Sequence, residues 1–242
     1  MPSGALERAV DLLHHIGEQP VGPTVAELAG EAGMPTSTAY RLLAELEQHG
    51  LVQRGPDSTV ALGTRLVALG RTAEAGLRER LVEPATAVME ELCREVGETV
   101  ILTAPCALEA IVLHVVETEL HSVRLSYTVF RRGPMHRGAS GKVLAAYLEP
   151  AERRRLIGAA DVPGLEADLD RVREHGIAVT VGELDEGAAA VAAPILDRRG
   201  RLVAGLSIAG PAQRMTASVP ALSVAVADAA RRVQRRAAPE PA

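Results

Sequence analysis

The sequence predicts an α+β protein of two parts, and three observations support this. Residues 5–50 carry apolar side chains at helical spacing, interrupted by glycine and proline. Two short strand-like runs follow on either side of Gly-Pro-Asp-Ser at 55–58, as in a hairpin. Beyond residue 77, strand-like runs occur in two clusters separated by helical segments. That order is typical of an α+β domain with a mostly antiparallel sheet.

The composition narrows the classes of protein. Apolar residues make up 47% of the 242, enough for a buried core, but aromatic residues make up only 2%. Few bases could therefore stack on aromatic rings, which argues against a single-strand nucleic-acid binder. The two cysteines, Cys93 and Cys106, form no disulfide framework and no metal-binding spacing. With no leader and no apolar run long enough to span a membrane, we expect a cytoplasmic protein without a membrane partner.

The net charge argues against nucleic-acid binding, which the pattern of residues favours. The net charge is −5, and residues 1–76 hold five arginines against nine acidic residues, which gives −4. Nucleic-acid binders usually carry a basic surface. DNA binding must therefore be supported by the pattern of residues and not by bulk charge.

The first two predicted helices are defined by their ends. The first has apolar residues at helical spacing and ends before Pro20, the predicted core positions being Leu6, Val10, Leu13 and Ile16. The second opens with a capping box, in which Thr24 and Glu27 satisfy each other's backbone N–H groups, and it ends at Gly33.

The third predicted helix has two different faces. Thr36 is the expected N-cap, and the helix runs to about Gly50. Its apolar face consists of Ala39, Leu42, Leu43 and Leu46. The opposite face carries Ser37, Arg41, Ala44 and Gln48, with Thr38 and Glu45 beside them and Tyr40 on the flank. Small hydroxyls suit phosphates and arginine suits a guanine edge, so this face fits a major groove. An ordinary three-helix bundle with a solvated face is the alternative.

The hairpin that follows favours DNA binding. Three helices and a two-stranded wing form the winged helix-turn-helix arrangement. Arg54, beside the wing tip, could contact a phosphate or the minor groove, or be a solvated turn residue. The predicted DNA-binding residues are Thr36, Ser37, Thr38, Tyr40, Arg41 and Arg54.

The remaining elements follow in order. Residues 64–76 form an amphipathic linker helix, with Leu66, Leu69 and Ala73 on one side. Further helices are predicted at 81–97, 141–148, 150–158, 165–176 and 217–236. Strands are predicted at 99–105, 109–117, 122–129, 176–181, 189–197 and 201–210, and the tail beyond residue 236 should be disordered.

The segment Gly-Ala-Ser-Gly-Lys at 138–142 resembles a phosphate-binding loop but fails its pattern. That loop would need glycine at His136 and serine or threonine at Val143. The small residues nevertheless leave backbone N–H groups at a helix N-terminus, where a ligand carboxylate could bind. A plain N-cap formed by Ser140 is the alternative.

Three segments together resemble the IclR family of bacterial transcription regulators. They are "AELAGEAGMPTSTAYRLLAELEQHGLV", "GPMHRGASGKVLAAYL" and "GIAVTVGELDEGAAAVAAPILDRRGRLVAGLSIAGPAQRM", which occur in the order that the family has. The resemblance implies a winged helix-turn-helix at 1–63, a linker helix at 64–77, a GAF/PAS-like effector-binding domain at 78–237 and a disordered tail at 238–242. It further implies a repressor that binds a palindromic double-stranded DNA operator as a homodimer or as a dimer of dimers.

The resemblance also implies where the effector binds. The family's effector positions fall on Ala139, Ser140, Thr180, Ala190, Ser207 and Ala209, with Leu125 and Met135 as further walls. Because three of the six are alanine, the effector is expected to be a larger, more apolar organic acid or an aromatic compound. Alternatively, the pocket is small and without function, and Thr180 and Ser207 only bond to the backbone. No cofactor, metal site or catalytic residue is expected.

Two other functions stay open at this point. A hydrolase could use Ser140 with His136, but the sequence has no G-x-S-x-G elbow and no acid placed to orient the histidine. A ligand-binding scaffold without DNA contact would show the same pocket. Cys106, at a strand end, is a candidate redox-sensing thiol without further support.

Overall fold

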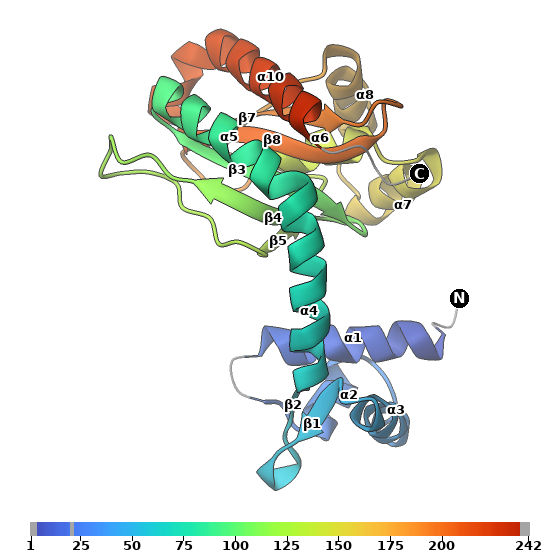
Figure 1. Ribbon diagram of the computed structural model, residues 1–242. Coiled ribbons are helices and arrows are strands. Elements are labelled where there is room, and N and C mark those ends of the chain that lie inside the picture. The colour runs from blue at the N-terminus through green and yellow to red at the C-terminus, as the bar shows by residue number, and fades with distance from the viewer. Residues whose placement is uncertain (1–3, 20–21, 238–242) are drawn as a thin grey trace. The chain divides into compact units, whose positions relative to one another are not determined.

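The computed structural model describes residues 4–19 and 22–237 (Figure 1). The chain divides into two compact units, Met1–Gly76 and Leu77–Ala242. The predicted disorder of 238–242 concerns residues outside the described part of the chain.

The first unit is the predicted set of three helices and a hairpin. Helices α1 (Ala5–Glu18), α2 (Val25–Glu31) and α3 (Thr36–Gln48) are followed by the antiparallel strands β1 (Val52–Arg54) and β2 (Val60–Leu62), with a 3-10 turn at Pro56–Ser58 between them. The core lies between the helices and one face of the hairpin, and its fully buried members include Leu12, Leu28, Leu42 and Leu43. The Thr24–Glu27 capping box is present as predicted.

Two details of the prediction for these helices were wrong. In α1, Leu6 is 79% exposed and Val10 39% exposed, whereas Leu12 and Ile16 are buried. The helix has two overlapping apolar stripes. The stripe that contains Leu12 is the one that packs into the core. In α3, Pro35 occupies the N-cap position and no side chain caps the helix, so Thr36 is its first helical residue. The Pro35 carbonyl accepts from the N–H groups of Thr38 and Ala39 at 2.9 and 3.1 Å, so the helix begins at Thr36 without a side-chain cap.

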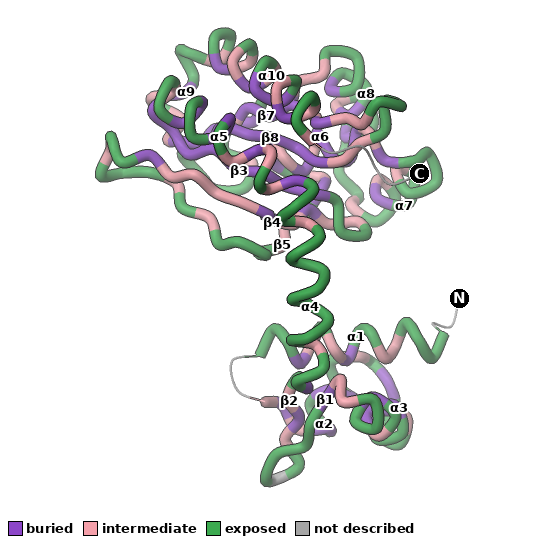
Figure 2. The backbone as a smooth tube through the Cα atoms, in the orientation of Figure 1, coloured by how far each residue is buried: buried purple, intermediate pink, exposed green. Residues whose placement is uncertain are grey.

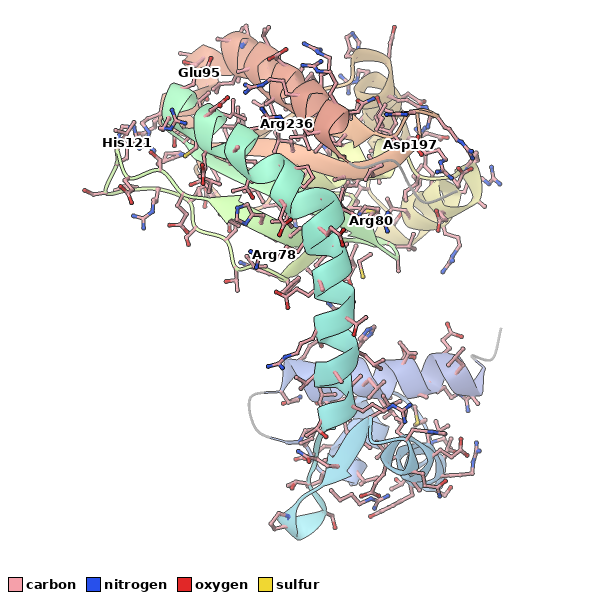
Figure 3. The ribbon with its side chains drawn as sticks, viewed as in Figure 1. Arg78, Arg80, Glu95, His121, Asp197 and Arg236 are labelled. Atoms are coloured by element: carbon pink, nitrogen blue, oxygen red, sulfur yellow. The ribbon has the colours of Figure 1, made fainter. Side chains whose placement is uncertain are left out.

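The linker helix continues without a break into the second unit. Helix α4 (Thr64–Leu77) has no buried residue, as Figure 2 shows by its colour. It passes into a π-helical turn at Arg78–Val82 and then into α5 (Glu83–Val96). Figure 3 shows Arg78 and Arg80 on this turn. The physical cause is Pro84, which lacks an N–H and whose ring would collide with the carbonyl four residues earlier, so the helix widens there.

The second unit is built on a six-stranded sheet. The strands are β3 (Thr99–Cys106), β4 (Glu109–Val116), β5 (Arg132–Pro134), β6 (Ala178–Val181), β7 (Ala188–Leu196) and β8 (Leu202–Pro211). Their order across the sheet is β5-β4-β3-β8-β7-β6, and every pair is antiparallel. The α+β prediction with an antiparallel sheet is confirmed.

Helices cover both faces of this sheet (Figure 1). The remaining helices are α6 (Ala139–Ala146), α7 (Pro150–Ala160), α8 (Leu165–His175), α9 (Ala212–Met215) and α10 (Val219–Arg236), with a 3-10 turn at Thr216–Ser218. Alternate residues of β7 point to opposite faces, as strand geometry requires. Val191 packs in the core formed with α5 and α10, while Ala192 packs in the core formed with α6 and α8.

The strand predicted at 122–129 does not form. The predicted alternation is partly present, because Leu125 and Tyr127 are half-buried and Val129 is exposed, but the segment is irregular. The chain bonds to Val112 of β4 at Phe130 and Arg131, and it then forms β5, which pairs with β4 through Arg132–Pro134. The alternating pattern alone therefore gave an incorrect strand prediction.

Candidate DNA-binding face and ligand pocket

Helix α3 presents a polar face to solvent. Thr36, Ser37, Tyr40 and Arg41 are exposed and Thr38 is half-buried, while the leucines of the opposite face are buried in the first unit's core. One ion pair lies along the polar face, with Arg41 Nη1 2.9 Å from Glu45 Oε1. The helix thus offers hydroxyls and a guanidinium on one exposed side.

The wing is attached to this helix through Arg54. Its Nε donates to Glu47 Oε2 at 3.1 Å, and its guanidinium lies 5.5 Å from the centroid of the Tyr40 ring. The six predicted DNA-binding residues therefore come from α3 and the strand beside it. The sequence interpretation assigned no role to Glu45 or Glu47, although the i, i+4 spacing from Arg41 to Glu45 was a readable signal.

The second unit encloses a cavity of about 200 Å³ between the sheet and the start of α6. All six positions taken from the family resemblance line it: Ala139, Ser140, Thr180, Ala190, Ser207 and Ala209. Strand alternation explains the grouping on β8, because Leu206 and Ile208 face the α5–α10 core while Ser207 and Ala209 face the cavity.

The two further walls predicted for the cavity do not line it. Met135 is fully buried in the core beneath α6, where it packs with the apolar side chains of that helix. Leu125 packs against Ile101 and Val112 from the irregular segment, and its carbonyl accepts a hydrogen bond from Thr99. These side chains support the cavity from behind its lining.

The two serines that line the cavity are hydrogen-bonded to each other. Ser140 Oγ donates to Ser207 Oγ at 2.8 Å, and Ser207 Oγ makes a long 3.5 Å contact with the carbonyl of Ile101. Ser140 is not the N-cap of α6, because Gly138 holds that position with φ +74°. The hydrogen bond that the structure gives the Ser140 hydroxyl therefore goes to Ser207 and not to His136.

The N-terminus of α6 is joined to the β6–β7 loop by Glu183. Its carboxylate accepts from the Gly138 N–H at 3.1 Å and from Lys142 Nζ at 2.6 Å. Lys142 Nζ also lies 3.2 Å from Asp168 Oδ2. Desolvation opposes ionisation of Asp168, but the contacts with Lys142 and Arg171 outweigh it and lower its pKa. The sequence interpretation missed this network.

The next three N–H groups of the helix, those of Ala139, Ser140 and Gly141, begin the first turn and have no helical acceptor. Gly141 allows this turn to lie close to β5, because a Cβ there would be 2.5 Å from the carbonyl oxygen of Pro134. The cavity wall therefore offers backbone donors at the positive end of a helix.

The rim of the cavity carries charged groups that the sequence did not indicate. Tyr127 and Arg131 come from the irregular segment, and Asp185 comes from the β6–β7 loop. Burial, and then the Asp185 carboxylate, raise the pKa of the Tyr127 phenol, so it stays a protonated donor at neutral pH. The Arg131 guanidinium has no carboxylate partner within 4–19 and 22–237. A cation at the rim that no carboxylate of the described residues pairs with favours an anionic ligand.

Other kinds of site find no support in the described residues. They contain no group of histidine, cysteine, aspartate and glutamate side chains able to hold a metal ion. Over the same residues, no helix has both the length and the apolarity that crossing a membrane requires.

Comparison with known proteins places both units in one family. A family model described as "Bacterial transcriptional regulator IclR C-terminal" matches residues 77–235, and the "IclR helix-turn-helix domain" matches residues 5–56. The chain is 31% identical over 225 residues to the HTH-type transcriptional regulator KipR of Bacillus subtilis, covering 88% of this chain and 89% of that protein. It is 32% identical to the glycerol operon regulatory protein of Streptomyces coelicolor, covering 96% and 95%.

Solved structures agree. An IclR transcriptional regulator from Silicibacter has a TM-score of 0.78 at 24% identity and covers 99% of this chain and 100% of that one. An IclR homologue from Microbacterium hydrocarbonoxydans, complexed with 4-hydroxybenzoate, has a TM-score of 0.68 at 25% identity, covering 96% and 98%. Because family models match both units, the chain belongs to the IclR family of bacterial transcription regulators.

Proposed function

We propose that this regulator is a homodimeric repressor that binds a palindromic operator through α3 and the wing, and that a small organic acid in the second unit controls the binding. Its parts would be the winged helix-turn-helix at 1–63, the linker at 64–77 and the effector domain at 78–237. Repression is supported by the relative named transcriptional repressor AllR, from Salmonella typhi, at 30% identity. Two-fold symmetry would place two copies of α3 on two half-sites.

On DNA, the residues of the first unit would contact different groups: phosphates, base edges and the backbone beside the wing. The hydroxyls of Thr36, Ser37 and Thr38 open the helix and suit phosphates, where the N-terminal dipole adds a favourable field. Arg41 lies one turn further on and suits a guanine edge. Arg54, with Tyr40 beside it, would contact the backbone next to the wing. The net negative charge of residues 1–76 matters less, because the electrostatic potential needs to be positive only where these donors meet the DNA.

For the ligand, the cavity favours a compact acid with an apolar body. A cavity of about 200 Å³ is smaller than the roughly 300–1,000 Å³ of pockets for drug-sized ligands, which suits a single ring or a short chain. The apolar body would lie against Ile101, Val112 and Ala209. Its carboxylate would accept from the free N–H groups at the start of α6, with the Arg131 charge nearby. The 4-hydroxybenzoate bound by the Microbacterium homologue is a compound of this class.

Control would operate by population shift. A ligand that fits one arrangement of the effector domain better than another shifts the equilibrium by its difference in affinity. The continuous helix from Thr64 to Val96 is the covalent route to the winged helix. Operator affinity would then change because the two copies of α3 would fit the spacing of the two half-sites better or worse.

The observation that carries this proposal is the convergence of six small or hydroxyl-bearing residues on one cavity, beside helix N–H groups that have no acceptor within the helix. A thermal-shift screen of the full chain with benzoate, 4-hydroxybenzoate and short organic acids tests it. A ligand at 100 times its Kd should stabilise the protein by about 2.7 kcal/mol. The Ser140→Ala variant should lose part of that shift, because the Ser140 hydroxyl lies in the cavity wall beside those N–H groups, while the matched Ser223→Ala variant, altered on α10 away from the cavity, should keep it.

Two results would count against this assignment. A shift that Ser140→Ala keeps in full would place the ligand outside the cavity. A protein stabilised by no acid of the panel, but by neutral or cationic compounds, would contradict the anionic class.

A further inference from the structure

The polar face of α3 contains a carboxylate where DNA binding calls for donors. Glu45 lies one turn after Arg41, and their side chains are 57% and 61% exposed. A carboxylate so close to the proposed DNA surface would repel phosphates and lower affinity for DNA of any sequence. Its presence on this face therefore needs a reason.

Folding does not supply that reason. The bond that the structure gives Glu45 is its exposed ion pair with Arg41, and exposed pairs of this spacing contribute little to stability. Glu47 differs, since it holds Arg54 of the wing at 3.1 Å. Within residues 4–19 and 22–76, the ion pair with Arg41 joins Glu45 to its own helix and not to another element.

The chemistry of the major groove supplies one. An ionised carboxylate is acceptor-only, and the base edges in this groove that donate are cytosine N4 and adenine N6. Guanine O6 and N7 and thymine O4 are acceptors, which a carboxylate repels but a guanidinium binds. Arg41 and Glu45 thus have opposite base preferences on one face.

The spacing suits neighbouring base pairs. Four helical residues rise about 6 Å, against about 3.4 Å between base pairs along one strand. A guanidinium has five N–H donors, so Arg41 can bind a guanine edge while it still donates to Glu45. The ion pair of the free protein can therefore persist on DNA and keep both side chains in position.

We propose that Glu45 is a specificity-determining residue, whose carboxylate accepts from cytosine N4 within about two base pairs of the guanine read by Arg41. This rests on the proposed operator binding through α3. The Arg41–Glu45 pair would read a guanine and a nearby cytosine in each half-site, and Glu45 would exclude guanine and thymine from that second position.

In vitro selection from a randomised duplex library, with the full chain at a fixed salt concentration, tests this. The wild type should enrich a symmetric site with a cytosine close to a guanine in each half. The Glu45→Gln variant should bind random DNA more tightly, because one negative charge is gone, and its preference at that position should move from cytosine to adenine, whose N6 and N7 an amide binds together, by about 5-fold or more. The guanine preference should remain. Glu74→Gln, which removes the same charge from α4, should leave the selected site unchanged.

The outcomes separate this inference from the function on which it rests. If the wild type enriches no sequence, the proposed operator binding fails. If it enriches a symmetric site that Glu45→Gln reproduces unchanged, operator binding stands and the role of Glu45 is wrong. Loss of the guanine preference alone would also overturn the inference, because Glu45 would then only orient Arg41.

Discussion

Replacing Arg41 with alanine should separate DNA recognition from folding. The side chain is 61% exposed, and the structure gives it one ion pair, with Glu45 at i, i+4. Such a pair contributes about 0.3–0.5 kcal/mol, and alanine is the better helix former. The Tm of Arg41→Ala should therefore stay within about 2 °C of the wild type.

The effect on the operator should be far larger. A bidentate contact with a base is worth about 1–3 kcal/mol, and a symmetric dimer makes it twice. Affinity for the operator should fall by about 30-fold to 10⁴-fold. Fluorescence anisotropy with a labelled duplex at one stated salt concentration measures this. Arg71→Ala, which removes an exposed arginine from α4, is the matched control and should bind almost as the wild type does.

Two results would refute this reasoning. Operator affinity within about threefold of the wild type would show that Arg41 does not contact bases. Equal losses on operator and on unrelated DNA, with a smaller salt dependence, would mean that Arg41 binds only phosphate.

Three further predictions concern the second unit. Gly141→Ala should cost about 1–3 kcal/mol in urea unfolding, because its Cβ would meet the Pro134 carbonyl at 2.5 Å; an unchanged midpoint would contradict the close approach of α6 to β5. Glu183→Gln should raise the affinity for benzoate in calorimetry, since a negative charge leaves the Gly138 end of α6, and a weaker affinity would argue against a carboxylate there. Asp168 has a pKa lowered from 3.8 in the folded protein. Its ion pairs therefore stabilise the fold above that pH and lose this effect as the pH falls through the lowered value, so the stability advantage over Asp168→Asn should disappear in acid and not in base.

The first unit could be predicted from sequence because its signals are local. Leucine periodicity, the Thr24 capping box and the turn at Gly55 each concern residues close together in the chain, and all correspond to observed elements. The errors arose where tertiary packing decides which of two possible apolar faces of a helix is buried. Leu6 and Val10 fit a helical stripe as well as the buried residues do, and only contact with the other helices decides between the stripes.

The second unit shows where sequence reasoning fails. Lys142 and Glu183 are 41 residues apart, and nothing near either residue indicates their 2.6 Å contact. Tyr127 lines the cavity from within 122–129, a segment that the alternating pattern predicts as a strand and that is irregular in the structure. The π-helical turn, by contrast, had a local signal in Pro84, inside a continuous helical pattern.

Whether α3 reads base edges in the major groove is tested most directly by changing one atom of the DNA. Replacing the selected guanine with 7-deazaguanine removes N7 and keeps the base pair intact. The wild type should lose about fivefold or more in affinity for that duplex, while Arg41→Ala should bind both duplexes equally. An unchanged wild-type affinity, or the same loss in both proteins, would contradict recognition of the operator by this face of the helix.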